Sequence, residues 1–120
     1  MTIQPPNPQQ FLPLTPAVFH VLLALMEEDK HGYAILQSIT RRTGGQVRMG
    51  TGTLYGIIKR LLADGWIEES DERPDPSLDD ERRRYYRLTR LGAQVASAEA
   101  ERMAQLVTAA RRQGLLPNLE

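Results

Sequence analysis

Residues 51–67 read TGTLYGIIKRLLADGWI, and this stretch decides the fold. Its apolar residues recur every three or four positions, which predicts a helix with one buried face. They are Leu54, Ile57, Ile58, Leu61 and Leu62. Gly65 ends this helix, because glycine readily adopts the left-handed conformation found at helix ends. Upstream, Gly50-Thr51-Gly52-Thr53 is predicted as a loop that leads into a helix cap.

Two shorter helical patterns precede this stretch. Thr15-Pro16 opens the first, since threonine can cap free amides of a first turn and proline fits the first helical position. Its apolar face, within residues 16–28, comprises Ala17, Val18, Val21, Leu22 and Leu25. The second pattern is brief and stops at Gly44-Gly45. Its apolar residues are Tyr33, Ile35, Leu36 and Ile39.

Short strands and one long helix complete the pattern. Residues 66–70 and 84–88 are rich in aromatic and branched side chains and flank an acidic insert, which predicts two strands joined by a loop. A very short edge strand is predicted at Val47 and Met49. Thr89 is expected to cap a last helix that runs to about residue 113. The predicted fold is mainly α with a small β-hairpin: a winged helix-turn-helix followed by a C-terminal helix.

The chain is expected to divide into four parts. Residues 1–13 are rich in proline and are predicted to form a flexible arm, in which Phe11 and Leu12 are candidates for docking onto the rest of the chain. Residues 14–88 form the predicted winged-helix DNA-binding domain. Residues 89–113 form the predicted dimerisation helix, and residues 114–120 a tail.

Composition excludes several classes of protein. With 120 residues, 41% of them apolar, the chain suits one compact domain. The absence of cysteine excludes disulfides, thiolate catalysis and cysteine-ligated zinc. No nucleophile is spaced with a base, and no ligand cluster for a metal or cofactor is recognisable, so an enzyme is not expected. With neither a secretory signal nor a membrane span, a cytoplasmic protein is predicted.

The net charge is zero, which argues against unspecific nucleic-acid binding through bulk electrostatics. The charges are nevertheless segregated along the chain. Every charged residue within residues 41–60 is basic, and residues 64–81 are strongly acidic. A second basic block follows, with Arg82, Arg83, Arg84, Arg87 and Arg90. The two basic blocks predict a cationic face if folding brings them together.

The order of three helices and a hairpin predicts how DNA would be bound. In a winged helix the third helix enters the major groove and the hairpin follows the backbone. Hydroxyl groups can donate to phosphate, and lysine or arginine can neutralise it. The candidate DNA-binding residues are Arg48, Thr51, Thr53, Tyr55, Lys59, Arg82, Arg83 and Arg84.

The last helix carries an apolar stripe that a monomer would expose. The candidate dimerisation residues are Leu91, Val95, Met103, Leu106 and Val107. A twofold dimer would place two reading helices roughly one turn of DNA apart, about 34 Å, on an inverted repeat.

Four strings of the sequence resemble the signature of the PadR family of transcriptional repressors. They are His31-Gly32-Tyr33-Ala34-Ile35, Gly52-Thr53-Leu54-Tyr55-Gly56, the run from Arg60 to Ile67 and the run from Arg84 to Gly92. The resemblance implies a homodimer that is released from DNA by a small, often aromatic or hydrophobic, effector, and it points to the compact branch with one C-terminal helix. Some compact relatives hold a flat ligand with a tryptophan of the last helix, which this chain lacks.

Two departures and one alternative accompany this resemblance. Gly56 stands where many relatives carry proline, and the wing is long and acidic, so its tip is a poor phosphate contact. The alternative function is a winged-helix protein-interaction module that uses its acidic wing without touching DNA.

Four aromatic or histidine residues carry predictions of their own. His31 is predicted to be a cap or surface residue, and Trp66 is predicted to lie in the core. Of Tyr85 and Tyr86, one is expected in the core and one partly exposed.

Overall fold

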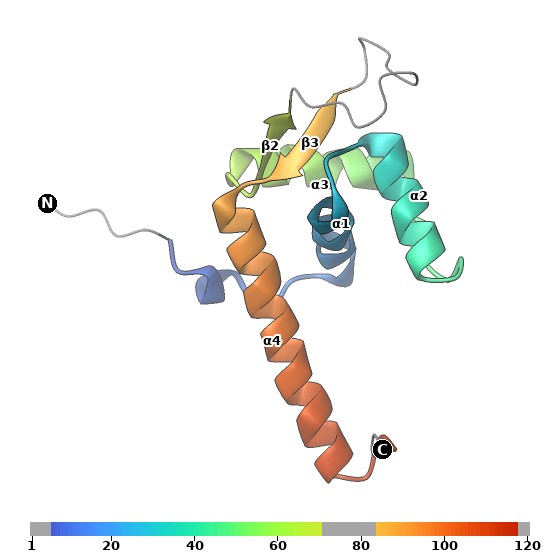
Figure 1. Ribbon diagram of the computed structural model, residues 1–120, viewed down its shortest axis with the longest axis vertical. Coiled ribbons are helices and arrows are strands. Elements are labelled where there is room, and N and C mark those ends of the chain that lie inside the picture. The colour runs from blue at the N-terminus through green and yellow to red at the C-terminus, as the bar shows by residue number, and fades with distance from the viewer. Residues whose placement is uncertain (1–5, 71–83, 118–120) are drawn as a thin grey trace, which may run out of the picture.

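The computed structural model describes residues 6–70 and 84–117. Within this part, the predicted order of helices and strands is confirmed, with two short additions (Figure 1). The helices are η1 (Pro8–Phe11, a 3-10 turn), α1 (Pro16–Glu27), α2 (Gly32–Arg42), α3 (Thr51–Ala63) and α4 (Arg90–Arg112), and the strands are β1 (Lys30–His31), β2 (Ile67–Ser70) and β3 (Tyr85–Leu88). The acidic insert, with Arg82 and Arg83, lies outside the described residues.

Both ends of α1 are held by side chains. The Thr15 hydroxyl accepts a hydrogen bond from the Val18 amide at 3.3 Å, which confirms the predicted cap. At the other end, Lys30 is buried and its Nζ donates to the Ala24 carbonyl at 2.8 Å. The carboxylate of Glu27 lies 3.7 Å from that Nζ and partly offsets its buried charge. A buried lysine therefore satisfies one of the free carbonyls in the last turn of the helix.

The start of α2 and the loop after it are fixed by local hydrogen bonds. His31 Nδ1 accepts from the Ala34 amide at 3.2 Å, so the predicted reading of His31 as a cap is confirmed. After α2, the Thr43 hydroxyl accepts from the Val47 amide at 3.0 Å and donates to the Ile39 carbonyl at 2.9 Å. The Val47 amide is thus used within the loop. The predicted edge strand at Val47 and Met49 is wrong, because no strand forms there.

The sheet instead recruits β1 as its edge strand. Its order is β1-β3-β2, all antiparallel, with His31 opposite Tyr85 and Ser70 opposite Tyr85 on the other side. Because β3 is central, Tyr85 and Tyr86 are both buried, and the prediction that one would be partly exposed is wrong. The Tyr85 ring packs edge-on against the His31 ring, with centroids 5.2 Å apart. The cap of α2 is therefore also part of the wall that covers Tyr85.

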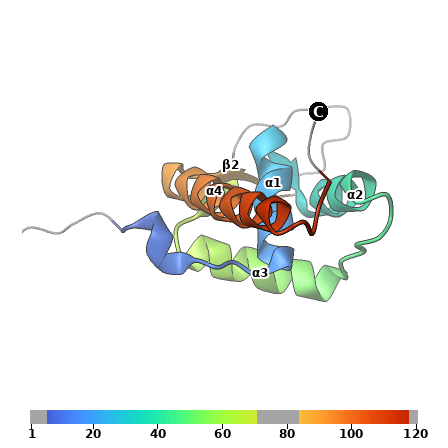
Figure 2. The same cartoon turned by 90° about the horizontal axis from the view of Figure 1, so that it is seen from below.

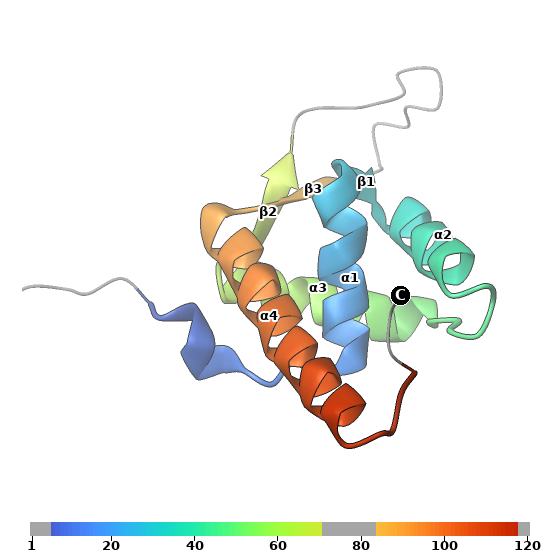
Figure 3. The same ribbon diagram turned by 60° about the horizontal axis from the view of Figure 1, so that its bottom comes forward.

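The core lies between α1, α2, α3 and the sheet, and α4 closes it by running beside α1 (Figure 3). Its most deeply buried residues include Val21, Leu22, Ile35, Ile39, Leu54, Leu61, Trp66, Ile67 and Val95. Trp66 is core, as predicted. Thr89 caps α4 by accepting from the Gly92 amide at 3.1 Å, which confirms the predicted start of the last helix.

Part of the predicted arm packs against the domain. The Phe11 ring lies edge-on against Trp66, with centroids 5.2 Å apart, as expected for a docking residue. The Leu14 amide donates to Oε2 of Glu99 at 2.6 Å, and Arg102 donates to the same carboxylate. Glu99 is 1% exposed, so its carboxylate is buried between the N-terminal segment and α4. Flexibility of residues 1–13 stays a prediction.

Replacing Glu99 with glutamine is expected to lower the unfolding free energy by about 1–2 kcal/mol at pH 7. The hydrogen bond from Arg102 lowers the pKa of Glu99; burial opposes this effect and the Leu14 amide supports it. A lowered pKa means that the carboxylate stabilises the fold above about pH 4.3, and that this contribution disappears as the pH falls through the folded pKa. Urea unfolding of both proteins between pH 7 and pH 3 should therefore show the difference shrinking.

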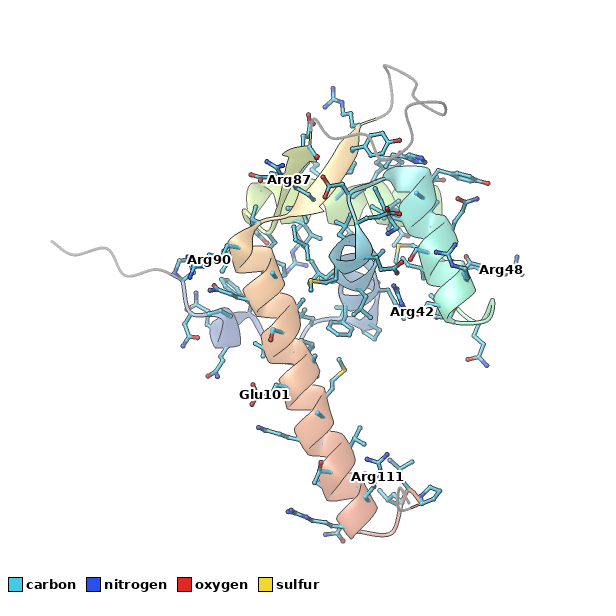
Figure 4. The ribbon with its side chains drawn as sticks, in the orientation of Figure 1. Arg42, Arg48, Arg87, Arg90, Glu101 and Arg111 are labelled. Carbon is cyan, nitrogen blue, oxygen red and sulfur yellow. The ribbon has the colours of Figure 1, made fainter. Side chains whose placement is uncertain are left out.

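The matched control for this measurement is Glu101→Gln, an exposed residue two positions further along α4 (Figure 4). It should change stability by less than about 0.5 kcal/mol. A difference at Glu99 that stays constant down to pH 3 would contradict the role of the carboxylate charge.

Candidate nucleic-acid interface

Helix α3 lies along one side of the molecule and presents its outer face to solvent (Figure 2). Leu54, Ile58 and Leu61 bury its inner face in the core. The exposed residues of the outer face include Thr51, Thr53, Tyr55, Lys59 and Arg60. The two charged side chains within α3 are both basic, so the outer face is polar and cationic.

The first turn of α3 is open to solvent. The helix begins at Thr51 with Gly50 as its N-cap, so the expectation that a loop through Thr53 leads into the cap is wrong. No side chain caps this end. The first amides of a helix have no intrahelical partner and carry the positive end of the helix dipole. Such an end, flanked by the exposed hydroxyls of Thr51 and Thr53, is suited to binding a phosphate.

Tyr55 connects α3 to the start of α2. Its side chain is 51% exposed, yet its ring covers Gly32, where an added Cβ would lie 2.6 Å from Tyr55 Oη. Glycine at position 32 therefore makes room for the tyrosine. The neighbouring Tyr33 is also exposed, although the sequence pattern placed it on the apolar side of α2. Tyr33 lies two residues before the buried Ile35, and residues at this spacing do not share a helix face. The prediction from the sequence overlooked this spacing.

Arg48 and Lys59 have no ion pair with any acid in the described part of the chain. Arg48 Nε donates to the Gly45 carbonyl at 3.5 Å, a long contact that leaves the guanidinium exposed. Lys59 is exposed two turns along α3 from Thr51. Both charges are therefore available to an anion.

Arg84 and Arg87, the basic residues at the base of the wing that the structure describes, are already paired. Arg84 donates to Glu69 at 3.0 Å, and Arg87 donates to Glu68 at 2.8 Å. These acids belong to β2, which the register places beside β3. Figure 4 shows Arg48 at the right of the view, beside the end of α2, and Arg87 near the upper middle, over the sheet. The structure thus groups Arg48, Thr51, Thr53, Tyr55 and Lys59 on or next to α3, and it ties Arg84 to the sheet.

The predicted dimerisation residues separate into two groups along α4. Val95 is fully buried in the protomer core, so its side chain packs within one chain and is not available to a partner. Leu91 and Met103 are partly buried. Leu106 is 56% exposed and Val107 38% exposed, on the half of α4 that projects beyond the other elements (Figure 1). Only this distal half offers a free apolar surface.

Two classes of site find no support in the described residues. None of the helices there combines the length and the apolar character that crossing a membrane requires. Within the same residues, histidine and acidic side chains do not gather into a group of three that could hold a metal ion.

A known protein family and a known protein are similar to this chain in sequence. The model of the PadR-like family of transcriptional regulators matches residues 21–98. An uncharacterized protein X of Lysinibacillus sphaericus is 34% identical over 86 residues, which span 72% of this chain and 76% of that protein.

Solved structures share the fold. BpsR of Bordetella bronchiseptica, whose DNA binding is regulated by 6-hydroxynicotinic acid, is 27% identical with a TM-score of 0.61; the match covers 91% of this chain and 75% of BpsR. Bacillus subtilis PadR, solved in complex with operator DNA, is 21% identical with a TM-score of 0.56; the match covers 71% of this chain and 45% of that protein. The predicted winged-helix fold class is confirmed.

Proposed function

This chain belongs to the PadR-like family of transcriptional regulators, and on that premise we propose that it binds double-stranded operator DNA as a homodimer and represses transcription. The observation that carries the proposal is the outer face of α3, where an uncapped helix start lies near Arg48 and Lys59, two basic side chains that pair with no acid among the described residues. The complex of Bacillus subtilis PadR with operator DNA supports it.

In this proposal α3 enters the major groove. The hydroxyls of Thr51, Thr53 and Tyr55 and the free amides of the first turn donate to phosphate oxygens, which fixes the register of the protein on the duplex. Arg48 and Lys59 neutralise phosphates, and arginine can also read a guanine edge with two hydrogen bonds. Arg84 contributes less, because its ion pair with Glu69 must first be broken.

DNA binding is tested by a gel shift with DNA from upstream of the gene, across a series of salt concentrations. Each neutralised phosphate contributes about −0.9 to the slope of log affinity against log salt. Arg48 and Lys59 of two protomers would therefore contribute about −3.6 to that slope. Absent binding, or binding that does not respond to salt, would contradict the proposal.

The proposed homodimer is supported by an apolar face of α4 that continues beyond the core of the protomer. Gly92, Val95, Ala96 and Glu99 are the buried residues of α4, and they lie on one side of the helix. The same three-and-four spacing continues through Met103, Leu106 and Val107, beyond the end of the protomer core. An apolar face that runs past its own domain is best covered by the equivalent helix of a second copy, which buries both at once.

We expect Leu106→Asp/Val107→Asp to weaken the dimer by roughly a hundredfold, since two central apolar side chains of an interface typically contribute about 1–2 kcal/mol each. Sedimentation velocity at several protein concentrations measures the change. The matched control is Gln105→Asp/Thr108→Asp, which adds the same charge to the opposite side of the helix. Equal loss in both variants, or no loss in either, would argue against this face.

Regulation by a small molecule is also proposed. The DNA binding of BpsR is regulated by 6-hydroxynicotinic acid, which supports an effector that releases this chain from its operator. A winged helix with a cavity close to α3 could respond in this way, and such a cavity is present next to Trp66.

A further inference from the structure

We propose that Gly32 is a positioning residue for DNA binding, which holds the ring of Tyr55 against the start of α2 and so directs the Tyr55 hydroxyl to a phosphate of the operator. This role rests on the proposed function, and it belongs to a buried residue rather than to one that contacts DNA. Gly32 lies in the first turn of α2 and Tyr55 in α3, so the pair joins two helices of the winged helix-turn-helix.

The backbone of Gly32 does not itself require glycine. Among the described residues, a positive φ is found at Gly44, Gly45, Gly65 and Gly114, and Gly32 is not one of them. Gly32 is also part of a helix, where alanine is more favourable than glycine. The reason for a glycine at this position therefore lies outside its own helix.

That reason is the tip of the Tyr55 side chain. A Cβ added at position 32 would lie 2.6 Å from Oη of Tyr55, 3.0 Å from its Cζ and 3.4 Å from its Cε1. These three atoms form the hydroxyl end of the ring, so the phenol lies with its polar end against the backbone of Gly32. A side chain at position 32 would displace the hydroxyl from this place.

The exposure of Tyr55 distinguishes positioning from packing. Its side chain is 51% exposed, so the ring covers Gly32 and still reaches solvent. The atoms that a methyl group at position 32 would meet are the far end of a side chain that can rotate away, and no backbone has to move. A hydroxyl that is held in one place before binding loses less conformational entropy when it donates to a phosphate. Gly32 should therefore affect operator affinity much more than stability.

Gly32→Ala is expected to lower operator affinity about tenfold in the gel shift, because each protomer of the dimer loses a preordered hydroxyl. Its thermal unfolding midpoint should change by less than about 4 °C, since the ring turns into solvent and alanine favours the helix. Unchanged operator affinity in the folded variant would overturn the positioning role. A larger change in the midpoint would assign Gly32 to the packing of the domain and would also overturn it.

A double-mutant cycle shows whether Gly32 acts through the Tyr55 hydroxyl. Tyr55→Phe should lower operator affinity about tenfold, because it removes a hydrogen bond to a charged group. Adding Gly32→Ala to Tyr55→Phe should lower the affinity by less than about twofold more, since no hydroxyl is left to displace.

The matched control for this cycle is Thr53→Ala, which removes another exposed hydroxyl from the outer face of α3. Adding Gly32→Ala to Thr53→Ala should still lower operator affinity about tenfold, because independent sites have additive effects. If Gly32→Ala lowers the affinity equally in the wild type and in Tyr55→Phe, the proposed action through the Tyr55 hydroxyl is wrong.

The contact itself is tested on the full chain without DNA. NMR should show nuclear Overhauser effects between the α-protons of Gly32 and the ring protons of Tyr55, given the short distances between the two residues. Their absence in the wild type would overturn the positioning role whatever the DNA affinity, and the proposed function would stand. Their presence in a protein that never binds operator DNA would contradict the proposed function, and the contact would then serve packing alone.

Discussion

Gly92→Ala is expected to lower the unfolding free energy by about 4 kcal/mol or more, or to prevent folding altogether, because the added methyl group has no space. A Cβ at position 92 would lie 1.9 Å from the Trp66 carbonyl oxygen and 2.9 Å from its carbon. Both are backbone atoms, so no side chain can rotate away. The only relief is to separate α4 from the end of α3.

The surrounding hydrogen bonds oppose that separation. The Trp66 carbonyl accepts from the Thr89 amide at 3.0 Å, and the Thr89 hydroxyl donates to the Gly65 carbonyl at 2.6 Å. Moving α4 outward breaks both and uncovers the Val95 side chain, which is fully buried. Urea unfolding followed by circular dichroism measures the loss.

Gly56→Ala is the matched control for this substitution. Gly56 lies inside α3, and an added Cβ would meet no atom within 4 Å. Alanine in an exposed helix interior is favoured over glycine by up to about 1 kcal/mol, so this variant should be slightly more stable than the wild type. Similar effects of the two substitutions would contradict the close approach of α4 to Trp66.

The double variant Arg48→Glu/Lys59→Glu is expected to lose operator binding by at least about a thousandfold at physiological salt, since four positions in the dimer change from attraction to repulsion of phosphate. Neither side chain pairs with an acid in the described residues, and both are exposed, so folding should be unaffected. The gel shift should also show a salt slope that is shallower by about 3.6.

A control of equal charge separates local contact from bulk electrostatics. Arg90→Glu/Arg112→Glu makes the same change in net charge at the two ends of α4 and should reduce binding far less. Arg90 lies on the opposite side of the view from Arg48 in Figure 4. If the Arg48 and Lys59 variant retained its regulatory activity, the alternative function, a module that binds a protein through its acidic wing, would be favoured over DNA binding.

Local sequence patterns were sufficient for most of the elements. The spacing of Leu54, Ile58 and Leu61 predicted α3, because helical periodicity is a property of the chain itself. Thr15, His31 and Thr89 marked helix starts, since a cap is made by a side chain and amides within three residues of it. The residues on the outer face of α3 followed from the same periodicity.

Predictions that depended on neighbours distant in the sequence were less successful. Strand β1 has two residues and no pattern of its own; it exists because β3 offers a free edge beside it. That edge helps to bury Tyr85, so that both tyrosines of β3 are buried, where alternation alone predicted that one of them would be partly exposed. The pairing of Arg84 with Glu69 follows from the register of β2 and β3, which the acidic insert between them does not reveal.

The sequence by itself determined the helices, the caps at Thr15, His31 and Thr89, and the basic outer face of α3, because each depends on residues within a turn or two of one another. Tertiary structure alone decided where the α4 stripe passes from the protomer core at Val95 to the exposed surface at Leu106, since periodicity marks a face and not the point where the domain ends. It also decided the cavity at Trp66, whose walls come from residues 11–18 and 60–66, two stretches that meet only after folding.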